Sequence, residues 1–114
     1  MAKPLQDTYP AYFFNYINQV PEEDLMTAFS NQQFIVDEFI PSIITKADYA
    51  YAEGKWTLKE MLQHIIDTER IFNYRALAIS RKESTSLPGF DENKYAANSN
   101  ANSRQWNDLS EELK

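Results

Sequence analysis

The scarcity of glycine is the feature that most constrains the fold of this chain. Only two glycines, Gly54 and Gly89, occur in 114 residues. An all-β domain of this length needs more glycines, because tight turns call for positive backbone angles that glycine adopts without strain. The scarcity therefore predicts an all-α fold. The length suits one domain, 1–114, and a hydrophobic content of 43% is enough to build one core.

Apolar residues recur at helical spacing through the first third of the chain. The aromatic stretch 9–20 predicts a short helix with one aromatic face. Pro21 and the three acidic residues after it suit the first turn of a second helix. Backbone N–H groups in the first turn have no partner within the helix, so proline loses no hydrogen bond there. Acidic side chains are stabilised by the positive end of the helix dipole. We expect Pro41 to end or kink this second helix near Phe39 or Ile40.

The longest predicted helix begins after Gly54 and extends to about Arg81. Thr57 and Glu60 have the T-x-x-E spacing of a capping box, in which two side chains satisfy backbone donors at the start of a helix. Apolar residues then follow at spacings of three and four. This pattern predicts a long amphipathic helix.

The stretch 82–102 carries a Pro-Gly pair, the adjacent acidic residues Asp91 and Glu92 and an Asn/Ser-rich tail, so it reads as a loop. Ser103 is the predicted N-cap of a last helix, which carries Trp106 and Leu109 on one face. That helix has no stop signal before Lys114. We therefore expect the chain to end inside an element.

Charge and composition exclude several classes of function. The 17 acidic residues exceed the 11 basic ones, and a net charge of −6 disfavours nucleic acid as a partner. The absence of cysteine excludes disulfides, zinc knuckles and thiol nucleophiles. No apolar run approaches the roughly 20 residues of a membrane span, and the N-terminus has no signal peptide. These features predict a cytoplasmic protein that does not enter membranes.

His64 is the only histidine, and it lies within the long predicted helix. Imidazole is the commonest transition-metal ligand, and Asp67 shares its helix face, from which a carboxylate could orient the ring. An E-x-x-H metal motif is absent, because Met61 occupies the position of the glutamate. The alternative reading is an ordinary helix residue. The serines have no neighbouring histidine, so nucleophilic catalysis has little support.

The run YAEGKWTLKEMLQHIIDTERIFNYRALAISR, continued by SLPGFDENKYA, resembles the DinB/YfiT-like superfamily of metalloenzymes, and in particular its DinB_2-type branch. The upstream segment DTYPAYFFNYINQVPEEDL is also similar to the N-terminus of that family. The resemblance implies an up-and-down four-helix bundle with a divalent metal, zinc or nickel, held by three histidines. It aligns His64 with the first ligand and implies a metal-dependent enzyme, with thiol S-transferase as the class expectation and an unknown small-molecule substrate.

The family pattern places its other two histidines in an H-x-x-x-H motif on the fourth helix. This chain has no second histidine, and by the resemblance it stops within the third helix. We therefore expect the metal not to be stably bound by this chain, with Asp67 as a neighbour of the one remaining ligand. We also expect homodimers, because missing helices would expose apolar faces. The rival hypothesis is a non-enzymatic helical module that self-associates or binds a partner.

Overall fold

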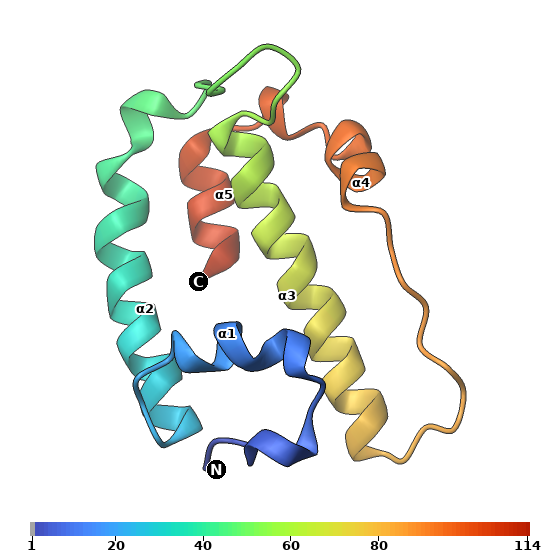
Figure 1. Ribbon diagram of the computed structural model, residues 1–114. Helices are drawn as coiled ribbons and strands as arrows, with labels where there is room; N and C mark the ends of the chain where they lie inside the picture. Colours follow the sequence, from blue (N-terminus) through green and yellow to red (C-terminus); the bar gives the residue numbers. More distant parts are fainter. Residues whose placement is uncertain (1) are drawn as a thin grey trace. The chain divides into compact units, whose positions relative to one another are not determined.

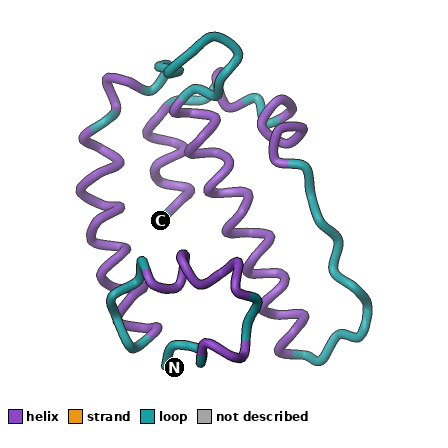
Figure 2. The backbone as a smooth tube through the Cα atoms, viewed as in Figure 1, coloured by secondary structure: helices purple, strands orange, loops and turns teal. Residues whose placement is uncertain are grey.

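The structure, a computed structural model, describes residues 2–114, and all regular elements in this range are helical (Figures 1 and 2). An isolated β-bridge between Ala2 and Asp24 is the exception, and it forms no strand. The predicted all-α fold is confirmed. Contacts between residues divide the chain into two compact units, with the boundary between Ser42 and Ile43. The single domain over 1–114 stays a prediction.

The first unit carries the aromatic N-terminal segment. It comprises the short 3-10 helices η1 (Gln6–Thr8) and η2 (Ala11–Phe13) and the helices α1 (Phe14–Asn18) and α2 (Leu25–Ser42). The predicted short helix is therefore present, as η2 followed directly by α1. The ring of Tyr12 lies 5.2 Å from that of Phe13 and 5.7 Å from that of Tyr16.

Helix α2 begins four residues after Pro21, so its predicted start was wrong. The side chain of Asp24 accepts a hydrogen bond from the backbone N–H of Thr27, at 3.0 Å. A carboxylate that binds the orphan N–H groups from just outside a helix stabilises its start more directly than an acid within the first turn. Glu22 instead accepts a hydrogen bond from Asn31 at 2.8 Å, which fixes the approach to the helix.

The helix does not end at Phe39 or Ile40, because α2 passes through Pro41 and ends at Ser42, whereas the alternative of a kink there stays a prediction. A proline in the last turn removes one hydrogen bond from a ladder that is about to end, so it costs less there than in a helix interior. The hydroxyl of Ser42 then donates to the carbonyl of Phe39 at 2.7 Å.

The second unit is organised around its longest helix, α3. Its elements in chain order are η3 (Ile44–Lys46), α3 (Leu58–Ser80), α4 (Glu92–Asn98), η4 (Ala101–Ser103) and α5 (Trp106–Leu113). Helix α5 lies alongside the first half of α3 (Figure 1). Leu62 and Ile66 of α3 and Trp106 and Leu109 of α5 are buried. The apolar stripe predicted for α3 is buried only in its first half, because Phe72 and Ile79 farther along the helix are exposed.

Helix α4 was missed, because 82–102 reads as loop in the sequence. The Asp91 carboxylate caps α4 by accepting the backbone N–H of Lys94 at 3.0 Å, and the Asn98 amide donates to the carbonyl of Lys94 at 2.7 Å. Seven residues are too few to show a helical period, and only Ala96 among them is buried. Helix α4 also contacts α3.

Ser103 does not cap the last helix, as was predicted, but ends η4. Helix α5 starts after Gln105, whose side chain makes no capping hydrogen bond. The extra 3-10 turn η4 lies between α4 and α5, and its Ala101 is buried. Helix α5 therefore starts two residues later than predicted. Among the helices of residues 2–114, none combines the length and the apolar character that a membrane crossing requires.

Replacement of Thr57 by alanine will destabilise the fold by about 1 kcal/mol, because the cap of α3 loses its hydroxyl acceptor. Chemical denaturation followed by circular dichroism measures the change. The matched control Thr57→Ser keeps the hydroxyl and should retain most of the stability. Equal stability of the alanine and serine variants would contradict the role of the cap.

Candidate functional site

The start of α3 is fixed by a capping box, which confirms the prediction from Thr57 and Glu60. The Thr57 N–H donates to the Glu60 carboxylate at 2.8 Å, and the Glu60 N–H donates to the Thr57 hydroxyl at 3.1 Å. The same hydroxyl donates to the side-chain oxygen of Asn102 at 2.6 Å, which ties η4 to this point. The backbone around the next two turns, which carry His64 and Asp67, is therefore firmly positioned.

His64 lies in the second turn of α3, half-buried, with its ring against Trp56. The two ring centroids are 5.1 Å apart and the planes are tilted by 49°. Trp56 directly precedes the cap residue Thr57, so the capping box also sets the position of this indole. Within 2–114, no hydrogen bond or ion pair joins the His64 imidazole to another side chain. Neither ring nitrogen of His64 is therefore hydrogen-bonded to a side chain in the described part of the chain.

Thr68 lies one turn after His64, on the same face of α3. Its hydroxyl oxygen is buried and has no hydrogen-bond partner among the described residues. A buried hydroxyl without a partner costs about 1–3 kcal/mol. The helix face that carries His64 therefore contains an unsatisfied polar group as well as an uncommitted imidazole.

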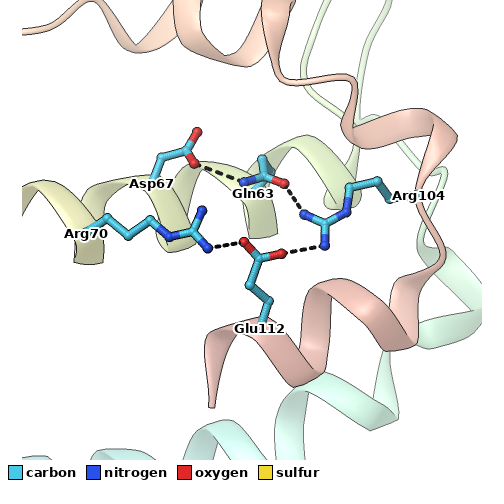
Figure 3. Close-up of polar contacts among 5 residues, drawn as sticks. All are labelled: Gln63, Asp67, Arg70, Arg104 and Glu112. Carbon is cyan, nitrogen blue, oxygen red and sulfur yellow. Dashed lines mark hydrogen bonds and ion pairs between the residues drawn. The ribbon is translucent and has the colours of Figure 1, made fainter.

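Asp67 takes part in a different set of contacts (Figure 3). Its carboxylate accepts a hydrogen bond from the Gln63 amide at 2.9 Å, and the Gln63 oxygen accepts one from Arg104 at 2.7 Å. Gln63 is only 6% exposed, so both of these bonds satisfy a buried amide. The described contacts do not join Asp67 to His64. A role for Asp67 in orienting a metal-bound His64 stays a prediction.

The Glu112 carboxylate of α5 lies between two guanidinium groups, those of Arg104 and Arg70 (Figure 3). The hydrogen bond from Arg104 has the largest effect on the pKa of Glu112 and lowers it below its ordinary value. Burial opposes this shift, and the hydrogen bond from Arg70 adds a smaller lowering effect. Together with Gln63 and Asp67, these residues form one polar network that joins α3 to α5. We call these five residues the α3–α5 network.

Sequence reasoning missed Gln63, Arg104 and Glu112 as members of this network. Gln63 and Asp67 have the i, i+4 spacing of a helical hydrogen-bonded pair, so that contact had a signal in the sequence. Arg104 follows Gln63 by about forty residues, and no local pattern connects the two. Arg70 of α3 pairs with Glu112 of α5.

The donor set of residues 2–114 does not fit a divalent metal. No group of three or more His, Cys, Asp or Glu side chains in this range lies close enough together to hold an ion. Catalytic zinc sites use three protein ligands and one open position. His64 is therefore at most one ligand of such a site.

A pocket of about 380 Å³ lies beside the cap of α3, lined by the rings of Tyr49, Tyr51 and Trp56 and by Met61. Trp56 lines this pocket, and its ring also lies against that of His64. The volume falls within the range of small-molecule sites.

The α3–α5 network makes stability depend on acid pH. The folded-state pKa of Glu112 lies below its ordinary value of 4.5, so its ionised form stabilises the fold above about pH 4.5, and this contribution is lost as the pH falls through the folded-state pKa. Glu112→Gln should lower the free energy of unfolding at pH 7 and weaken its dependence on pH below 4.5, as measured by urea denaturation across that range. The control Glu111→Gln removes the same charge from an exposed pair with Lys114 and should change both little. An unchanged pH profile in Glu112→Gln would contradict this account.

Comparison with known proteins places the chain in a family. No curated protein and no solved structure matches it. A family model described as the DinB superfamily matches residues 10–113, which is nearly the whole sequence. The match includes the capped helix α3, the network and His64. The chain belongs to the DinB superfamily, as the resemblance of its residues predicted.

Proposed function

We propose that this chain is part of a cytoplasmic DinB-type enzyme that depends on a divalent metal, zinc or nickel, and that His64 supplies one of the metal ligands. Thiol S-transferase is the reaction class that we propose, with a small molecule as substrate. Membership of the DinB superfamily supports the proposal. The observation that carries it is the face of α3 on which an uncommitted imidazole lies one turn from a buried, unpartnered Thr68 hydroxyl.

The other ligands have to come from outside a single copy of these residues, since the chain has one histidine and no described metal cluster. We propose that a second copy supplies them in a homodimer. Two copies of α3 would then contribute two His64 imidazoles, with carboxylates such as Asp67 completing the set. A shared site of this kind binds metal only in the dimer, so metal binding and dimer formation are thermodynamically linked.

Zinc and nickel should therefore bind with a stoichiometry of one ion for two chains and should promote dimer formation. Isothermal titration with each metal measures the first, and sedimentation velocity with and without metal measures the second. His64→Ala should abolish both effects. Absence of metal binding at chain concentrations where the dimer forms would overturn the proposal.

A relocated histidine provides the matched control. The double variant His64→Ala with Asn73→His keeps one histidine in α3, but residue 73 lies nine positions on and so on the opposite face, at roughly 100° per residue. This variant should not bind metal. Binding by the double variant would mean that any exposed histidine suffices, which contradicts a specific site.

The rival function, a helical module that self-associates without chemistry, is favoured by one observation. Several large apolar side chains of α2 are exposed, with Phe34 70% and Ile35 63% accessible. Exposed apolar clusters of a few hundred Å² usually mark an interaction surface. In this reading the dimer forms without metal and through α2.

The two functions differ in the residues that the dimer needs. If α2 is the interface, Phe34→Glu should shift the chain to monomer in light scattering coupled to gel filtration, with or without metal. Gln32→Glu adds the same charge to an exposed polar position of the same helix and should leave the dimer intact. A metal-dependent dimer that survives Phe34→Glu would exclude the module and support the shared metal site.

A further inference from the structure

A second pocket, of about 290 Å³, lies between the later part of α3 and the segment that follows it. The loop residues Leu87, Pro88, Gly89 and Phe90 form one wall, and α3 and Tyr95 of α4 form the rest. The lining is mostly apolar and aromatic. The rings of Phe90 and Tyr95 contact each other, with centroids 5.2 Å apart and planes tilted by 51°.

Two cationic side chains, Arg70 and Arg75, also line this pocket. Arg70 is already paired with Glu112 of the α3–α5 network. Arg75 is different: its guanidinium donates to the carbonyl of Pro88 at 2.8 Å, and no ion pair joins it to a carboxylate within 2–114. The bond to Pro88 holds the guanidinium against the loop wall and uses one of its five N–H donors.

Arg75 is also half-buried, and its guanidinium carbon lies 5.8 Å from the centre of the Phe72 ring. A half-buried cation without an acidic partner is unexpected in a chain with 17 acidic and 11 basic residues. The geometry leaves a fixed positive group, with spare donors, at the edge of an aromatic pocket. An anion is the chemical group that complements it, and Arg presents paired donors that match a carboxylate.

We propose that this pocket binds a small organic carboxylate with a flat apolar body, of the size of benzoate. The carboxylate pairs with Arg75 and the apolar body lies among Tyr74, Phe90 and Tyr95. The pocket volume is at the lower end of the range for small-molecule sites, so it suits a compact ligand. An inorganic anion satisfies the arginine but leaves the aromatic walls in contact with water.

This site is separate from the one around His64. Arg75 follows His64 by eleven residues, which is about 16 Å along α3 at 1.5 Å per residue. Both residues lie on nearly the same face, since eleven steps of roughly 100° leave a rotation of about 20°. Binding of the carboxylate therefore needs no metal and survives His64→Ala, whether or not the proposed metal site exists.

The two glycines of the chain make the test direct. Gly89 lines this pocket and Gly54 lines the pocket beside Trp56, so their amide signals in a nitrogen–proton correlation spectrum report on the two pockets separately. Titration of the 114-residue chain with benzoate should shift Gly89 in a saturable way and leave Gly54 in place. A shift of Gly54 alone, or no saturable shift of Gly89, would overturn the proposal.

Two further ligands test whether both the charge and the flat apolar body of benzoate are needed. Benzamide, a neutral molecule of the same shape, should bind at least about tenfold more weakly than benzoate, as expected for loss of a charge-assisted hydrogen bond. Inorganic phosphate should not saturate the Gly89 shift at concentrations where benzoate does. Equal affinity for benzoate and benzamide would show a pocket that is merely apolar and would overturn the role of Arg75.

A pair of arginine variants completes the experiment. Arg75→Gln should weaken benzoate binding by about tenfold or more, whereas Arg75→Lys should retain part of it through the remaining charge. Arg81→Gln removes an arginine of the same charge at the C-terminal cap of α3, outside the pocket, and should leave the affinity unchanged. Equal losses in Arg75→Gln and Arg81→Gln would mean that net charge, and not this pocket, attracts the anion.

Discussion

The buried amide of Gln63 is the constraint on which the second unit depends. An amide that is 6% exposed needs hydrogen-bond partners for both its N–H donors and its oxygen. The Gln63 amide N–H donates to Asp67, and the Gln63 oxygen accepts a hydrogen bond from Arg104. Arg104 reaches Gln63 only if η4 turns the chain back toward α3. Glu112 then pairs with both arginines, so the polar network requires the placement of α5 alongside α3 in which Leu62 and Leu109 are buried.

This arrangement has consequences for the face of α3 that carries His64. The capping box and Trp56 fix the histidine from one side, and the α3–α5 network engages Asp67 from the other. The imidazole of His64 and the hydroxyl of Thr68 have no hydrogen-bond partners in the described part of the chain. A rigid helix that offers an uncommitted ligand is suited to complete a site with groups from a second polypeptide, which is the basis of the function proposed above.

The long helix also organises the rest of the unit's surface chemistry. One pocket lies beside its cap, lined by three aromatic rings, and a second lies near its later turns, with Arg75 at its edge. The proposed ligands of this face are chemically distinct, a metal at His64 and an organic carboxylate at Arg75. The rise of a helix keeps such sites apart, because each turn advances by about 5.4 Å.

Local signals in the sequence predicted the all-α fold, the capping box of α3 and the family, because glycine scarcity, capping pairs and motifs can be read without the fold. The apolar stripe predicted for α3 is buried only in part: Leu62 and Ile66 are buried, whereas Phe72 is 55% and Ile79 70% exposed. Only the tertiary structure shows that 92–98 is a helix in contact with α3 and that Arg104 satisfies Gln63. The start of α2 at Leu25 is set locally, because the Asp24 carboxylate accepts a hydrogen bond from the backbone N–H of Thr27, three residues on. The contact of Arg104 with Gln63 joins residues that are far apart in the chain, and no spacing along the chain encodes it.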